Sequence, residues 1–446
     1  MSIKFTKRSI FYFLLTILCL LLVLRYAFRV DIPRMVLTLI VIAMAFLGDK
    51  NEILAISMAC IPMHNAVDFY ISIMACAIIL VVKHYDQVRM GFPVILALVM
   101  ILWEALHCWF FDFSPMTLAT SLVPLVFVAV VLSVDLQDTN YAFLVRVMSF
   151  MACIMCFVVL ANVVIRAEGD FSQAFSNLRR LGVLSEEETL FGGDINPNSL
   201  GIINVLCMTG LLQIRTVGQK KKYDLFLIFI LLLFGVLTLS RTFLVCLLFM
   251  FVLILAGQKK DWKRILRILA GAGAVCLVMI LVTNWIFPEV ISDFIKRFQV
   301  EDITTGRDSI MTQYHDYFVS HPVVMFFGVG MSDYAEKVVN IYHMSTHTPH
   351  NSIQEIIAAW GIPGLMMIAL LLFALIYESK RYGRRKSILN YVPLLIILLK
   401  SMAGQLLTST YSMLALAFAF MSLCQNFQLQ ETNESDYELV ASKTNL

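Results

Sequence analysis

Apolar runs near the length of a membrane-spanning helix recur along most of the chain, and short basic segments separate them. The clearest example lies between Lys222 and Lys259, where 36 residues carry only Asp224 and Arg241 as charges. As a helix this segment would be roughly 54 Å long at about 1.5 Å per residue, whereas the hydrocarbon core of a bilayer is about 30 Å thick. We therefore predict two crossings with a turn near the middle of the segment.

The composition agrees with a membrane protein and excludes several other classes. Of the 446 residues, 60% are hydrophobic and 15% are charged, and the mean hydropathy is +0.82; a soluble domain carries about 25% charged residues. The net charge is only +3 and no basic stripe interleaved with aromatic residues is present, which argues against a nucleic-acid partner. We predict an all-α polytopic integral membrane protein with about 12–14 transmembrane helices.

The ten cysteines all lie in apolar stretches, so we predict neither a disulfide framework nor a metal site. Cys153 and Cys156 form a C-x-x-C, but an apolar run surrounds them, which disfavours a redox role. The first apolar run, Ile10 to Leu24, lacks a small-x-small cleavage site after it. We interpret it as a retained helix and not as a cleaved signal peptide.

The basic connections predict how the chain threads the membrane, because cytoplasmic loops carry an excess of lysine and arginine. Counting crossings from these connections places both termini in the cytoplasm and the turn at Ser240, Arg241 and Thr242 at the outer face. The same parity places residues 167–194 and 288–348 outside. The connections are Lys83–Arg89, Arg215–Lys222, Lys259–Arg264 and Lys380–Lys386.

These assignments divide the chain into three parts. Residues 1–166 are predicted to form N-terminal transmembrane helices. Residues 167–424 form a second membrane region that includes the outer loops 167–194 and 288–348, the larger of which is partly helical. Residues 425–446 are polar without a core-forming pattern and are predicted to be a disordered cytoplasmic tail.

The large outer loop contains a candidate anion site at Arg307. Thr305 and Asp308 fit a capping box, and His321-Pro322 supplies a stop, so Arg307 falls in the first turn of a helix. A cation beside the free N–H groups of a helix start favours an anion such as phosphate. The alternative is that Arg307 pairs with a neighbouring aspartate at the surface.

The stretch from Thr348 to Gly364 places polar groups at the start of an apolar helix. Thr348 is the predicted N-cap and Pro349 the first helical residue. On such a helix His350 and Gln354 share one face with Ile357, Gly361 and Gly364, where small residues permit close approach of another helix. Pro363 predicts a kink or break.

A histidine at this position can act as a general base near neutral pH. The alternative for His350 is a structural hydrogen bond to a neighbouring loop. In the other outer segment Asn196 is the predicted N-cap of a helix with Pro197 at its first position. Arg179 and Arg180, earlier in that segment, are either ligand-binding or ordinary solvated loop charges.

These motifs, in this order, resemble those of the O-antigen ligase superfamily. "HNSIQEIIAAWGIPG" is similar to its H-N-x9-G-x-x-G pattern, with His350, Asn351, Gly361 and Gly364 in the four places. "LTLSRTFLVCLL", "TTGRDSIM", "FFGVGMSDY" and "INPNSLG" resemble further elements of the family. The resemblance covers roughly residues 179–375; Thr242 and Pro363 depart from the usual residues.

The resemblance implies a membrane glycosyltransferase that uses a glycan linked to undecaprenyl diphosphate, without a metal or other cofactor and with inversion. His350 would be the base, and Arg307, Arg241 and Arg180 would bind the diphosphate; Asn351, Gln354, Gly361 and Gly364 would support them. The implied location is the bacterial cytoplasmic (inner) membrane, with the active site facing outside. The implied partners are the lipid-linked oligosaccharide, the bilayer and an acceptor glycan or lipid A-core, together with a flippase and a chain-length regulator of surface-polysaccharide biosynthesis.

Three alternatives belong to other classes. A metal-dependent glycosyltransferase would need a carboxylate cluster at the outer face, where the first loop offers only Asp31. A transporter or flippase would favour charges at the bilayer midplane, for which Glu104 and Lys400 are the candidates. A purely structural or signalling membrane protein is the third. If the protein is a glycosyltransferase, we favour a repeat-unit polymerase of O-antigen or capsule, with an O-antigen ligase as the alternative.

Overall fold

The computed structural model describes residues 7–111, 114–166, 195–257, 281, 284–285, 307–332, 334–342, 348–383, 386–402, 404–407, 409 and 411–425. In these ranges all extended regular elements are helices, with one isolated β-bridge between Val88 and Val134. The α-helices are α1 (Lys7–Tyr26), α2 (Arg34–Leu47), α3 (Lys50–Ala59), α4 (Phe69–Lys83), α5 (Phe92–Phe111), α6 (Pro115–Ser133), α7 (Tyr141–Arg166), α9 (Pro197–Thr216), α10 (Lys222–Leu237), α11 (Arg241–Gly257), α14 (Arg307–Ser320), α15 (Pro322–Phe327), α16 (Tyr334–Tyr342), α17 (Ser352–Ser379), α18 (Ile388–Ser401) and α19 (Ser412–Cys424).

Among the described residues, six helices are long and apolar enough to cross a membrane, and five shorter apolar helices accompany them. This confirms the predicted all-α polytopic class. The predicted number of 12–14 crossings stays a prediction, because part of the chain lies outside the described ranges. Helices α14, α15 and α16 confirm that the described part of the outer loop 288–348 is partly helical, as predicted.

The outward faces of the helices are apolar. Phe110 is 77% exposed, and Leu248 and Phe373 are exposed to a similar degree. Contiguous apolar surface of this kind is unfavourable in water and is expected against lipid. The exposed side chains therefore agree with the bilayer assignment independently of the length of the helices.

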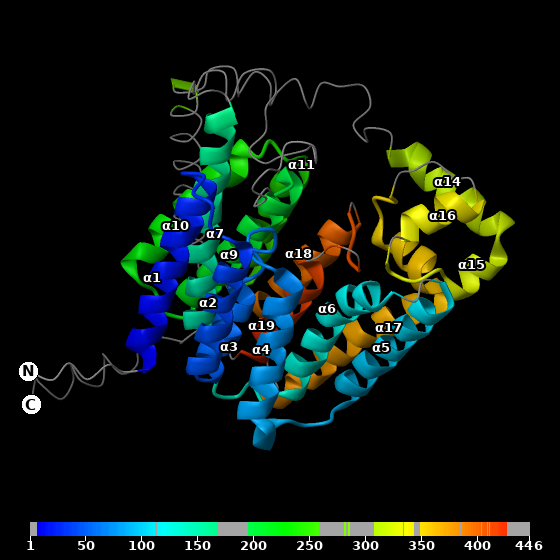
Figure 1. Ribbon diagram of the computed structural model, residues 1–446, viewed down its shortest axis with the longest axis horizontal. Coiled ribbons are helices and arrows are strands. Elements are labelled where there is room, and N and C mark those ends of the chain that lie inside the picture. Colours follow the sequence, from blue (N-terminus) through cyan, green and yellow to red (C-terminus); the bar gives the residue numbers. More distant parts are fainter. Residues whose placement is uncertain are drawn as a thin grey trace, which may run out of the picture.

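The interior of the bundle is built on helices that are buried on nearly all sides, namely α3, α9 and α19. Helix α9 packs against α7, α10, α11 and α18, and α19 packs against α6, α17 and α18. Figure 1 shows α14, α15 and α16 gathered around one end of α17, away from α1 and α10. The segment between Lys222 and Lys259 forms two helices, α10 and α11, joined by a turn at 238–240 as predicted; that each of them crosses the membrane stays a prediction.

A buried polar network ties the central helices together. The hydroxyl of Tyr141 on α7 donates to the Gln213 side chain on α9 at 2.6 Å, and Gln213 donates to Ser422 on α19 at 2.9 Å. Asn390 on α18 donates to the Ser422 carbonyl at 2.9 Å. Side-chain hydrogen bonds between helices substitute for the hydrophobic driving force that lipid does not provide, so this network helps to fix how α7, α9, α18 and α19 pack.

The polar connections gather at two ends of the bundle. At the first end the ammonium of Lys50 donates to Gln87 and to the Asp135 carbonyl, both at 3.0 Å. Arg89 forms an ion pair with Asp135 at 2.8 Å. Gln87 and Arg89 belong to the predicted basic connection Lys83–Arg89, while Lys50 begins α3 and Asp135 follows α6, so three connections meet at this end.

At the second end, side-chain hydrogen bonds join further connections in pairs. Ser240 donates to Asn198 at 2.8 Å, which joins the turn after α10 to the start of α9. Gln405, in the connection after α18, donates to the Tyr334 hydroxyl on α16 at 3.4 Å. The helices thus alternate between a basic end and an end that carries α14, α15 and α16.

Candidate active site

The first turn of α17 begins later than the sequence predicts. Helix α17 starts at Ser352, and its N-cap is Asn351, whose side chain accepts a hydrogen bond from the Ile353 N–H at 2.8 Å. The prediction that Thr348 is the N-cap is therefore wrong, because asparagine is a stronger cap than threonine and lies closer to the apolar run. His350 immediately precedes the cap, outside the helix. It does not share a helical face with Gln354 as predicted.

Helix α17 is broken at Gly361. This glycine has φ 69° and ψ −169°, a conformation that is essentially restricted to glycine. Pro363 lacks an N–H, so it cannot donate to the Ala359 carbonyl one turn earlier. The predicted break is therefore present, but the glycine sets its position and the proline follows two residues later.

The loop that contains Gly328 and Gly330 satisfies the carbonyls that the break exposes. The Val329 N–H donates to the Ala358 carbonyl at 2.9 Å, and the Gly330 N–H donates to the Ala359 carbonyl at 2.7 Å. The approach is so close that a Cβ on Gly361 would lie 2.2 Å from the Phe326 carbonyl oxygen. The G-x-G element and the G-x-x-G element are therefore two halves of one contact.

The two glycines of the G-x-x-G element differ in what they approach. Gly361 approaches the backbone of α15, as predicted for a small residue at a helix contact. A Cβ on Gly364 would instead meet the side chain of Trp360 on the same helix, at 2.2 Å. The prediction that Gly364 allows the close approach of a second helix is therefore wrong. Gly364 instead leaves room for the side chain of Trp360.

Replacing Gly361 with alanine is expected to lower the free energy of unfolding by at least about 2 kcal/mol, because the new Cβ combines a disallowed backbone conformation with a clash. The thermal unfolding midpoint of the purified protein in detergent measures this. Gly91→Ala is the matched control, since its Cβ would meet no atom closer than 3.5 Å. Equal midpoints for the two variants would contradict the role assigned to Gly361.

Three polar side chains of α5 hold the broken part of α17 in place, and sequence reasoning did not assign them this role. The Trp103 indole N–H donates to the Trp360 carbonyl at 3.2 Å. Glu104 accepts from the Trp360 indole N–H at 2.6 Å and from the Met331 N–H at 3.0 Å. His107 lies 2.6 Å from the Phe327 carbonyl through Nε2. The sequence feature that could have revealed these contacts is the occurrence of three hydrogen-bonding side chains inside one apolar run.

Glu355 and Lys400 organise the backbone of the connection after α18. The buried carboxylate of Glu355 accepts from the N–H groups of Leu406 and Leu407, at 2.6 and 3.2 Å. The ammonium of Lys400 donates to the Ser412 hydroxyl at 3.0 Å and to the Gln405 carbonyl. Both charges therefore hold a turn beside the start of α17.

Arg241 and Arg307 lie near one another although 65 residues separate them in the sequence. Arg241 is the first residue of α11, and Arg307 is the first residue of α14, as predicted from its first-turn position. Burial lowers the pKa of the Arg307 guanidinium below its ordinary value, and the positive charge of Arg241 lowers it further. An arginine stays protonated in proteins, so the fold concentrates two positive charges at this end of the bundle.

Gln354 connects this arginine pair to α17. Its amide nitrogen donates to the carbonyl of Met311, one turn after Arg307, at 2.7 Å. Its amide oxygen is buried and has no hydrogen-bond partner among the described residues. Because His350 lies four residues before Gln354, the structure brings His350 and Arg307 to the same end of adjoining helices.

The remaining predicted site features are placed as follows. Arg179 and Arg180 lie outside the described residues, as does Thr305 of the predicted capping box. Asn196 caps α9 with Pro197 at its first position, and α14 ends before His321-Pro322, both as predicted. Within the described part of the chain, no group of three His, Cys, Asp or Glu side chains has a metal-binding arrangement; metal independence stays a prediction.

Comparison with known proteins identifies the region to which this site belongs. Residues 226–369 match the family described as O-antigen ligase. The match extends from within α10 to within α17, and it includes Arg241, Arg307 and His350 but not Arg180. It is narrower than the predicted resemblance over 179–375, because it omits the N-P-N segment. No curated protein matches the chain.

Proposed function

Because residues 226–369 match the O-antigen ligase family, we propose that this protein transfers a glycan from an undecaprenyl-diphosphate carrier. The reaction takes place at the outer face of the bacterial cytoplasmic membrane, at the end of the bundle that carries α14 and the start of α17. The observation that supports this most directly is the nearness of Arg241 and Arg307 within the matched region. Two guanidinium groups near enough to interact electrostatically suit a diphosphate, whose binding relieves their mutual repulsion.

The proposed chemistry is a single displacement. An acceptor hydroxyl oxygen attacks the anomeric carbon of the donor sugar, and His350 accepts the hydroxyl proton. The bond between that carbon and the diphosphate oxygen breaks, and undecaprenyl diphosphate leaves with its electrons. Arg307, Arg241 and Arg180 stabilise the negative charge that develops on the leaving group. Attack from the opposite face inverts the configuration.

Gln354 and Asn351 act as supporting residues in this proposal. The buried amide oxygen of Gln354 is positioned to accept a hydrogen bond from a sugar hydroxyl, while its amide nitrogen stays on Met311. Asn351 fixes the start of α17. Glu104 and Lys400, the two charges on which the transporter alternative depends, instead form hydrogen bonds to backbone groups of turns, which favours the enzyme over the transporter.

The acceptor that we favour is a growing glycan on lipid diphosphate, which makes the protein a repeat-unit polymerase. Purified protein reconstituted with undecaprenyl-diphosphate oligosaccharide and EDTA tests this. A ladder of longer lipid-linked glycans supports polymerisation. Product that forms only after addition of lipid A-core supports a ligase. No transfer under either condition, with the protein folded and the correct donor sugar, would contradict both assignments. A flippase and a chain-length regulator are the expected partners of a polymerase.

A further inference from the structure

A large cavity lies at the basic end of the bundle, far along the chain from the proposed active site. It has a volume of about 1310 Å³ and lies between α1, α7, α10 and the loop before α10. Pockets for drug-sized molecules measure about 300–1,000 Å³, so this one has room for a larger ligand.

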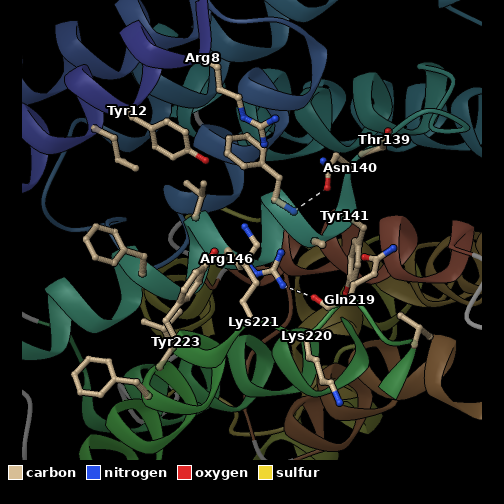
Figure 2. A pocket seen from close by; sticks show the side chains of 18 of the residues that line it. Arg8, Tyr12, Thr139, Asn140, Tyr141, Arg146, Gln219, Lys220, Lys221 and Tyr223 are labelled. Carbon is tan, nitrogen blue, oxygen red and sulfur yellow. Dashed lines mark hydrogen bonds between the residues drawn. The ribbon is translucent and has the colours of Figure 1, made fainter. Parts of the chain in front are cut away.

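The mouth of the cavity is positively charged. Arg8 comes from α1, Arg146 from α7, and Lys220 and Lys221 from the loop before α10 (Figure 2). Arg146 is already neutralised, because its guanidinium forms two hydrogen bonds to the carboxylate of Asp224, at 2.8 and 3.0 Å. Arg8, Lys220 and Lys221 are exposed, and they give the mouth its excess positive charge.

Away from the mouth, the lining of the cavity is mostly apolar, with Thr16 as a polar exception on α1. On α1 the lining side chains run from Arg8 at the mouth through Tyr12 to Leu15 and Cys19, a stripe about 16 Å long at about 1.5 Å per residue. Phe150 on α7 and Leu227 on α10 form further parts of the wall. The cavity thus changes from cationic to apolar in the direction of the helix axes.

This gradient matches one class of ligand. A phosphate headgroup suits the basic mouth, and an acyl chain suits the apolar wall. Tyr12 and Tyr223, which lie beside the mouth, are residues typical of the membrane interface. Anionic lipids are concentrated in the cytoplasmic leaflet, where basic pockets between helices bind their headgroups. We propose that this cavity binds an anionic phospholipid of the cytoplasmic leaflet, with its phosphate on Arg8, Lys220 and Lys221.

Native mass spectrometry of the purified full-length protein tests the proposal with phosphatidylglycerol and phosphatidylcholine as probes. The wild-type protein is expected to retain phosphatidylglycerol preferentially. Each basic residue near the membrane surface contributes a factor of about five in affinity for an anionic lipid. The triple variant Arg8→Gln, Lys220→Gln, Lys221→Gln is therefore expected to bind phosphatidylglycerol at least about tenfold more weakly, with phosphatidylcholine unchanged.

The matched control removes three charges from the same end of the bundle without touching the cavity. Lys7→Gln, Lys222→Gln, Lys380→Gln is that variant, since none of these side chains lines it. Retention of phosphatidylglycerol should be as in the wild-type protein. Equal loss in the two triple variants would overturn the proposal, because it would show a general effect of charge.

Two further arms separate the lipid from other occupants. Glycerophosphoglycerol, which lacks acyl chains, should not displace bound phosphatidylglycerol. If it does so when present at the same concentration as the lipid, the mouth binds a soluble phosphate compound and the proposal is overturned. A chain that ends at Gln425 should retain the lipid to the same extent as the full chain. If only the shortened chain retains the lipid, the acidic segment 426–446 occupies the cavity in the full-length protein, and the proposal is overturned.

Discussion

Replacing His350 with alanine is expected to lower the rate of glycan transfer about 10²- to 10⁴-fold, the range that a positioned general base contributes. The reason is that the acceptor hydroxyl must lose a proton as it attacks, and alanine cannot accept one. Transfer by the reconstituted protein is measured as turnover of undecaprenyl-diphosphate oligosaccharide. The fold should be unaffected, because Asn351, and not His350, caps α17.

His315→Ala is the matched control for this experiment. His315 lies on α14 in the same outer segment, and its side chain is 74% exposed. The His315→Ala variant should turn over the donor at the wild-type rate. If His350→Ala also retains the wild-type rate while its unfolding midpoint is normal, His350 is not the base. If its midpoint falls instead, His350 is a structural residue, which is the alternative that the sequence left open.

Replacing Arg307 with lysine is expected to lower kcat/KM for transfer roughly 10- to 100-fold. Lysine keeps the positive charge but loses the planar fork that binds two phosphate oxygens at once. A hydrogen bond to a charged group contributes about 1.5–3 kcal/mol, which corresponds to this range. Arg241→Lys should behave similarly, because its charge lies close enough to lower the pKa of Arg307.

The double variant distinguishes a shared ligand from two independent roles. If both arginines bind one diphosphate, the losses of Arg307→Lys and Arg241→Lys should not add, since residues that share a partner are coupled. Arg381→Lys is the control; it pairs with Glu378 at the other end of the bundle and should have no effect. If the Arg307→Lys variant keeps the wild-type kcat/KM, Arg307 does not belong to the site. If the losses of the two single variants add fully in the double variant, the two arginines bind different ligands.

Features that depend on neighbours in the sequence were predicted correctly. The Asn196-Pro197 start of α9, the break before Pro322 and the position of Arg307 in a first turn each follow from hydrogen bonds within a few residues. The division of the segment between Lys222 and Lys259 into two helices, α10 and α11, follows from the length of one apolar run. The register of the α17 start was wrong because two caps, Thr348 and Asn351, compete and the spacing alone does not rank them.

The sequence by itself determined that the chain is a helical membrane protein, where most of the described helices begin, and which of its motifs resemble those of the O-antigen ligase family. Only the tertiary structure decided what those motifs contact. Gly361 is required because the Phe326 carbonyl approaches it, and Glu104 because it accepts from Trp360, more than 250 residues away. The nearness of Arg241 to Arg307 likewise arises from packing. Hydrophobic periodicity and capping residues reflect interactions within a few residues. Contacts between distant segments depend instead on which helices pack together, and helices with similar apolar surfaces do not reveal this in their sequences.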